Sequence, residues 1–112
     1  MDLNDRVAEA LKDNKSWFPE LALDLRHHTL GLAGEAGEVA NEVKKWDRGD
    51  YGVIEGSDSV DAILFRKRIA AELADVLVYT FSIAGMLGIK LDEVYNEKRE
   101  FNEGRFGHGL AH

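Results

Sequence analysis

Residues 70–87, AAELADVLVYTFSIAGML, form the most continuously apolar stretch of the chain and decide its fold. Between Leu73 and Leu87, apolar residues would lie on nearly every side of a helix, which is typical of a helix buried on more than one side. The helix is expected to run from about Ala62 to Leu87, because Gly88 is a good helix stop. In a chain of 112 residues, such a helix predicts that a partner subunit completes the core.

Two acidic residues, Glu72 and Asp75, interrupt this apolar stretch one helical turn apart. A buried charge costs several kcal/mol unless a positive group meets it. An ion pair with Arg68, four residues earlier, would be an ordinary explanation for Glu72. Asp75 has only Ala71 and Tyr79 at the corresponding positions, and Asp is a poor helix former, so a role other than stability is indicated.

A second acidic pair with the same spacing, Glu35 and Glu38, lies in GLAGEAGEVANEV, residues 31–43. Surface charge explains most such pairs. Two pairs on two facing helices, however, match the oxygen coordination of Mg²⁺, or of Mn²⁺ in its place, with substrate phosphates completing the shell. Such ions activate a water molecule and neutralise phosphate charge. A di-iron site is disfavoured, because it would need Glu-x-x-His motifs.

Composition limits the class of protein. The 112 residues predict a single domain, 1–112, and 45% of them are hydrophobic, which is typical of a folded globule. The net charge of −7 argues against binding to a nucleic acid polymer. Cysteine is absent, which excludes disulfides and zinc–thiolate sites. We expect no membrane partner and a cytoplasmic location, since no leader or apolar run of membrane length is evident.

Apolar periodicity predicts an all-α fold, a compact antiparallel bundle of four main helices. The helices are expected at about 3–11, 21–46, 62–87 and 92–104, with a loop at 47–61 in which Val53 and Ile54 form a short extended piece. Ser16 is a plausible cap for the second helix, with Pro19 in its first turn.

The last helix places basic and amide groups on its apolar face. Lys98, Asn102 and Arg105 are spaced i, i+4, i+7, and the acidic residues take the other side. Lys and Arg side chains also reach past apolar surface to solvent in ordinary helices, so this spacing admits both a structural role and a phosphate clamp. Trp17, beside a turn, is a candidate for stacking on a nucleotide base.

Three segments in this order, GLAGEAGEVANEVKKW, ELADVLVY and KREFNEGRFG, resemble the MazG-type nucleoside triphosphate pyrophosphohydrolases. The resemblance covers roughly residues 30–107. Its E-E-x-x-E…E-x-x-D pattern of metal ligands matches Glu35, Glu38, Glu72 and Asp75, but Gly34 replaces the first Glu. Its K-x-x-x-N-x-x-R pattern, which contacts phosphates and sugar or base, matches Lys98, Asn102 and Arg105.

The resemblance implies a helical homodimer or homotetramer that hydrolyses a nucleoside triphosphate to a monophosphate and pyrophosphate. All-α dUTPases and phosphoribosyl-ATP pyrophosphatases are relatives of this family, so the substrate stays open. The sequence also fits a nucleotide-binding bundle without turnover, in keeping with Gly34, or a structural dimerisation bundle whose acids have no ligand.

Overall fold

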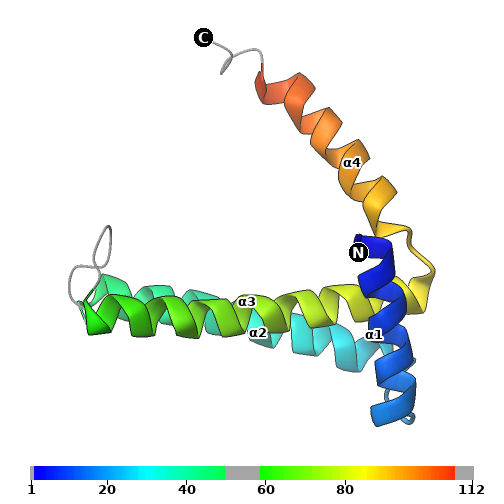
Figure 1. Ribbon diagram of the computed structural model, residues 1–112, viewed down its shortest axis with the longest axis horizontal. Coiled ribbons are helices and arrows are strands. Elements are labelled where there is room, and N and C mark those ends of the chain that lie inside the picture. Colours follow the sequence, from blue (N-terminus) through cyan, green and yellow to red (C-terminus); the bar gives the residue numbers. More distant parts are fainter. Residues whose placement is uncertain (1, 50–58, 108–112) are drawn as a thin grey trace. The chain divides into compact units, whose positions relative to one another are not determined.

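The computed structural model describes residues 2–49 and 59–107, and all regular structure in these two ranges is helical (Figure 1). The prediction of an all-α fold is therefore confirmed. The expected extended piece at Val53 and Ile54 lies outside the described residues. The helices are α1 (Leu3–Trp17), α2 (Leu25–Asp47), α3 (Val60–Leu87) and α4 (Leu91–Asn102), and a π-helical turn, Glu103–Gly107, follows α4.

The boundary between α1 and α2 differs from the expectation. Ser16 lies inside α1, which continues to Trp17, so its predicted role as a cap of α2 is wrong. Residues 19–23 form turns rather than the start of a helix. The cap of α2 is Asp24, whose side chain accepts a hydrogen bond from the backbone N–H of His27 at 3.0 Å. A carboxylate here satisfies one of the unpaired N–H groups in the first turn of α2.

The described chain divides into two compact units, and the second of these, Asp24–Thr80, is a helical hairpin. Near the end of α2, the ring of Trp46 contacts Phe65, and both rings pack against Ala62, which is fully buried. Near the start of α2, His28 contacts Tyr79 at 6.1 Å between ring centroids. The contacts pair late α2 with early α3, so α2 and α3 run antiparallel (Figure 1).

The first unit, Met1–Leu23 with Phe81–His112, packs α1 against the last turns of α3. A side chain at Gly85 would lie 3.2 Å from Cβ of Leu11, so the small residue permits this close approach. Ser82 is buried, and its hydroxyl accepts a hydrogen bond from Nδ2 of Asn14 at 2.8 Å. A buried hydroxyl needs such a partner, and the bond therefore fixes the position of α1 along α3.

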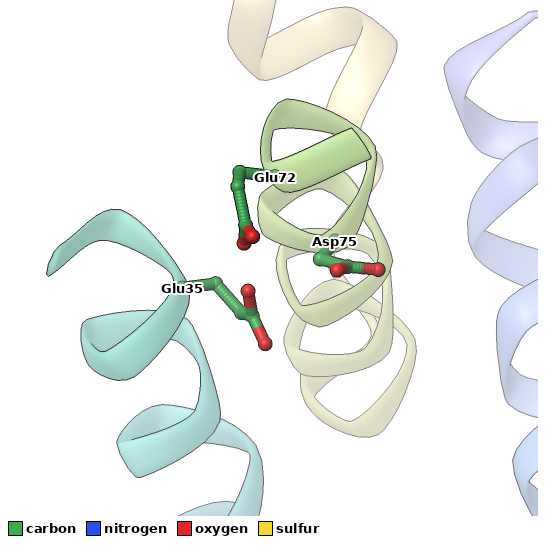
Figure 2. Close-up of side chains that lie close together, drawn as sticks. All are labelled: Glu35, Glu72 and Asp75. Atoms are coloured by element: carbon green, nitrogen blue, oxygen red, sulfur yellow. The ribbon is translucent and has the colours of Figure 1, made fainter. Parts of the chain in front are cut away.

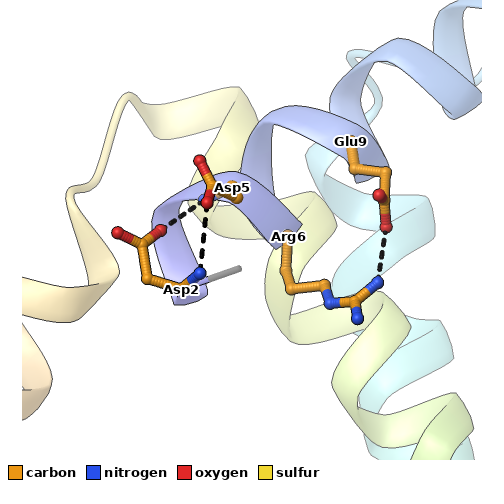
Figure 3. A network of polar contacts seen from close by, with 4 residues as sticks. All are labelled: Asp2, Asp5, Arg6 and Glu9. Atoms are coloured by element: carbon orange, nitrogen blue, oxygen red, sulfur yellow. Dashed lines mark hydrogen bonds and ion pairs between the residues drawn. The ribbon is translucent and has the colours of Figure 1, made fainter.

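The start of α1 carries a reciprocal cap (Figure 3). The backbone N–H of Asp5 donates to the Asp2 carboxylate at 2.8 Å, and the N–H of Asp2 donates to the Asp5 carboxylate at 3.1 Å. One turn later, Arg6 and Glu9 form an exposed ion pair at 3.0 Å, which contributes little to stability.

Apolar side chains of α3 stay half exposed in a single chain. Leu73, Leu77 and Val78 retain 49%, 49% and 51% of their surface, although the sequence predicts burial on more than one side of this helix. Among the described residues, the buried apolar side chains are small, with Val7 the largest of them. Completion of the core by a partner subunit therefore stays a prediction. The packing of all four helices into a single compact bundle also stays a prediction.

By length and composition alone, α3 is apolar enough to cross a membrane, with a mean hydropathy of 1.5 in its most apolar window. The core helix of a soluble protein passes the same test. Glu72 and Asp75 lie in the middle of this helix, and each would be costly in hydrocarbon. The expectation of no membrane partner stays a prediction.

We expect Gly31→Ala to destabilise the hairpin, because a methyl group at this position would overlap the ring of Tyr79. Overpacking of this kind lowers the free energy of unfolding by roughly 1–3 kcal/mol, measured by chemical denaturation. In a Tyr79→Ala background, where the ring is gone, the same change should no longer destabilise. Equal costs in both backgrounds would contradict the assigned contact.

Gly37→Ala is the matched control, since nothing lies within 4 Å of a side chain added there. It should raise the free energy of unfolding by about 0.5–1 kcal/mol, because alanine loses less backbone entropy than glycine in a helix.

The cap of α1 should depend on pH. The pKa of Asp2 lies below its usual value of 3.8, chiefly because the backbone N–H of Asp5 hydrogen-bonds to its ionised carboxylate. The stabilisation is thus present above this usual value and is lost as the pH falls through the lower, folded-state pKa. We expect the difference in melting temperature between the wild type and Asp2→Ala to shrink on acidification. A constant difference from neutral to acidic pH would argue against this cap.

Candidate metal centre and nucleotide site

Three carboxylates converge between α2 and α3. Figure 2 shows Glu35 pointing from α2 towards Glu72 on α3, with Asp75 one turn further along α3. One carboxylate oxygen from each residue lies within 4.8 Å of those of the other two. All three residues belong to the hairpin unit, so this geometry is internal to one compact part of the chain. Acids from the two predicted pairs are therefore brought together.

The close approach of Gly31 to Tyr79 helps to set this separation. Gly31 lies one turn before Glu35 on α2, and Tyr79 lies one turn after Asp75 on α3. Because Gly31 has no side chain, the Tyr79 ring packs directly against the α2 backbone. The rings of His27 and His28 contact the same tyrosine at 6.4 and 6.1 Å between centroids. Tyr79 thus holds the helices together beside the acids.

The closeness of these carboxylates changes the electrostatics of the group. The pKa of Glu72 is raised above its usual value of 4.5, first because it shares a hydrogen bond with the Glu35 carboxyl group, and further by desolvation. The negative charges of Glu35, Asp75 and Glu42 add to this effect. A bound divalent cation would oppose this rise in the pKa of Glu72, because it favours the ionised form of a carboxylate.

The donor atoms suit a hard divalent cation. The group offers three carboxylate oxygens and no nitrogen or sulfur ligand. Oxygen ligands of this kind suit Mg²⁺ and Mn²⁺, whereas thiolate and imidazole groups suit softer transition metals. Glu35 and Glu72 are half-buried and Asp75 is exposed, so one side of the group stays open to water or to a ligand.

Two further acids of α2 lie outside this group of three. Glu38 is exposed, and its role as a fourth metal ligand stays a prediction. Glu42 is buried, with 7% of its surface exposed, and forms an ion pair with Lys45 at 3.2 Å. Nothing lies within 4 Å of a side chain added at Gly34, so the position before Glu35 is open space.

The predicted phosphate-binding residues lie on α4 and the π-helical turn, in the other unit. Lys98 and Arg105 both lie over the ring of Phe101, at 5.1 and 5.6 Å from its centroid. Arg105 also lies 4.6 Å from the centroid of the Phe106 ring. Asn102 is half-buried on the same segment. The two cations therefore both lie close to one aromatic ring of this segment.

Trp17 ends α1 and is 65% exposed. With Phe18, Pro19, Glu20 and Leu21 it lines a shallow pocket of about 270 Å³. An exposed indole beside a turn is available for stacking on a planar ligand, and its role in binding a base stays a prediction.

The sequence profile of the MazG nucleotide pyrophosphohydrolase domain matches residues 25–106. The matched range contains the three converging carboxylates and the two cations beside Phe101. The chain belongs to the MazG family. The family resemblance drawn from the three sequence segments is thereby confirmed.

A relative of this MazG chain is the gene 37 protein of Mycobacterium phage L5, which is 41% identical over 70 residues. The aligned region makes up 62% of this chain and 55% of the phage protein, so the chain spans about half the length of this relative. No solved structure matches the chain.

Replacing one acid of the cluster should have opposite effects without and with metal. We expect Glu72→Gln to raise the melting temperature of the metal-free protein, because it removes a repulsive charge. It should also weaken the increase in melting temperature that we expect Mg²⁺ to give the wild type by mass action. Thermal unfolding with and without Mg²⁺ measures both effects.

The pH dependence has a defined sign. Because the pKa of Glu72 is raised in the folded protein, its contribution to the stability of the metal-free protein falls as the pH rises from 4.5 through the folded-state pKa. Glu72→Gln should remove this fall. Glu100→Gln, an exposed change on α4, is the control and should leave both the fall and the Mg²⁺ effect unchanged. A normal Mg²⁺ effect in Glu72→Gln would exclude Glu72 as a ligand.

Proposed function

We propose that this protein is a divalent-metal-dependent nucleoside triphosphate pyrophosphohydrolase that produces a nucleoside monophosphate and pyrophosphate. The observation that carries the proposal is the convergence of Glu35, Glu72 and Asp75, whose ligand oxygens lie within 4.8 Å of one another. Membership of the MazG family supports the reaction class. The proposed ion is Mg²⁺, with Mn²⁺ as a substitute, and Glu38 is the proposed fourth ligand.

The carboxylates would hold the ion and orient its ligands. When bound, the ion supplies Lewis acidity towards the phosphate oxygens and lowers the pKa of a coordinated water. The reaction adds the oxygen of one water molecule to phosphorus and breaks the bond between the α- and β-phosphates, and pyrophosphate is the leaving group. Because the carboxylates of the cluster are acidic, a polyphosphate that carries a divalent cation should bind beside them better than a free polyphosphate.

The remaining predicted residues would bind the substrate. Lys98 and Arg105 would neutralise phosphate charge, with Arg105 capable of a bidentate contact. Asn102 would orient a polar group of the sugar or base, and Trp17 would stack on the base. The contacts of Lys98 and Arg105 with the Phe101 ring support phosphate binding, since the ring holds the two cations close together on one segment.

We also propose that the active form is a homodimer or homotetramer located in the cytoplasm. The half-exposed apolar residues of α3 support self-association, because a soluble chain would otherwise leave a large apolar surface in water. Size-exclusion chromatography with light scattering would measure the assembly.

The direct test is pyrophosphate release from each common nucleoside triphosphate, with and without Mg²⁺. Asp75→Asn should lower kcat/KM by roughly a hundredfold or more, because metal stabilisation of transition-state charge is worth several kcal/mol and each 1.4 kcal/mol is a factor of ten. Asp61→Asn is the matched control, since it makes the same chemical change in the exposed first turn of α3.

Unchanged pyrophosphate release in Asp75→Asn would contradict the assigned ligand. Tight calorimetric binding of a nucleotide by the wild type, without any product, would instead identify a nucleotide-binding protein that does not catalyse hydrolysis.

A further inference from the structure

The N-termini of α1 and α4 cap each other. The two carboxylate oxygens of Asp92 accept hydrogen bonds from the backbone N–H groups of Leu3 and Asn4, both at 3.2 Å. In return, the side-chain oxygen of Asn4 accepts from the backbone N–H of Asp92 at 3.1 Å. The Nδ2 group of Asn4 also donates to Glu93 at 3.0 Å. These four bonds join residues 88 or 89 positions apart in the chain, and all lie within one compact unit.

The hydrogen bonds between Asn4 and Asp92 replace a side-chain cap that α4 lacks within its own segment. Lys90 occupies the cap position of α4 and makes no capping hydrogen bond with its side chain. The first N–H groups of a helix have no partner within the helix, so an outside acceptor is needed. Asn4 supplies one from α1. The charge of Asp92 is also favourable there, because it lies at the positive ends of both helices.

Little else supports α4 within the described chain. The helix has 12 residues and none of them is buried. Val94, Tyr95 and Phe101 retain 48%, 57% and 55% of their surface. A helix of this length is marginal in water by itself, since its stability normally comes from packing of an apolar face. The capping exchange at its first turn is therefore its principal link to the rest of its unit.

We propose that Asn4 and Asp92 are positioning residues for nucleotide binding, because they order α4 and so hold Lys98, Asn102 and Arg105 in place. This inference rests on the proposed function, which assigns those three side chains to the substrate. Neither Asn4 nor Asp92 needs to touch the nucleotide. The loss of either removes an acceptor for backbone N–H groups and frees the helix that carries the binding groups.

The first arm of the test is amide hydrogen exchange, which requires no activity. Asn4→Ala removes the cap of α4 and should speed exchange in residues 91–102 by roughly fivefold, the factor expected for loss of one helix cap. Asp92→Ala removes the acceptor for the first N–H groups of α1 and the link between the two helices, so it should speed exchange at the start of α1 as well as in α4. Exchange in α2 should stay unchanged, which also shows that the variants are folded. Glu93→Gln is the control, because it keeps a side-chain acceptor and leaves the two backbone caps intact. Unchanged exchange in α4 would overturn the proposal.

The second arm swaps the two side chains between positions 4 and 92. The swap is made in the Glu93→Gln background, so that a carboxylate at position 4 meets no repulsion from Glu93. Asn4→Asp alone places a carboxylate against Asp92 and should speed exchange in α4. Combination with Asp92→Asn keeps one oxygen acceptor on each side and should restore slow exchange. Failure of the combined variant to restore it would contradict a specific capping role.

The third arm is steady-state kinetics at saturating Mg²⁺. The alanine variants should raise KM for the nucleoside triphosphate by roughly fivefold with little change in kcat, as expected when binding shared by ground and transition states is lost. The reciprocal variant should restore KM. Faster exchange in α4 with an unchanged KM would overturn the positioning role. If the wild type hydrolyses no nucleotide, the proposed function fails, whereas the exchange arm still decides whether the two caps order α4.

Discussion

The contact between the α2 backbone and the Tyr79 ring is the constraint on which the hairpin depends. Gly31 permits this contact, because any side chain there would overlap the ring. The contact lies one turn from Glu35 and one turn from Asp75, so it sets how close the acids of the two helices come. Their proximity raises the pKa of Glu72, chiefly through a hydrogen bond shared with Glu35. The absence of a side chain at Gly31 is thereby linked to the raised pKa of Glu72 in the candidate metal centre.

The same hairpin shows an imbalance between charge and apolar packing. Its three converging acids repel one another when they are ionised and no cation is bound. Among the described residues of the hairpin, Ala62 is the fully buried apolar residue. Leu73 and Leu77 on α3 stay half exposed beside this site. A protein with so small a core gains little from burial within one chain. Ligand binding and self-association would each add free energy that the isolated hairpin lacks.

The other unit obtains its order from polar contacts rather than from a large core. The Asn14–Ser82 bond fixes α1 on α3, and the bonds between Asn4 and Asp92 fix α4 on α1. Such bonds are directional, so they determine register and orientation better than apolar contact does. The cations of α4 are held in turn by stacking on Phe101. Each helix in this unit is thus oriented by a few specific side chains.

Much of the fold and part of the candidate site follow from the sequence. The apolar periodicity predicts the four helices, because a helix repeats its faces every 3.6 residues whatever its surroundings. The spacing of Glu72 and Asp75 places them on one face, and the spacing of Lys98, Asn102 and Arg105 does the same. The predicted start of α2 fails, because Asp24 competes successfully with Ser16 as a cap and only the folded chain shows which side chain meets the free N–H groups.

Contacts between helices were decided by tertiary structure alone. Local spacing cannot show that Glu35 meets Glu72, that Glu38 lies outside this group, or that Tyr79 packs on Gly31. The bonds between Asn4 and Asp92 join residues 88 positions apart, and no periodic pattern in the chain predicts them. Helical order depends on neighbours three and four residues away, and the sequence by itself therefore determined the helices and their faces. The distances between faces depend on how side chains of separate helices fit together, and these were set only when the chain folded.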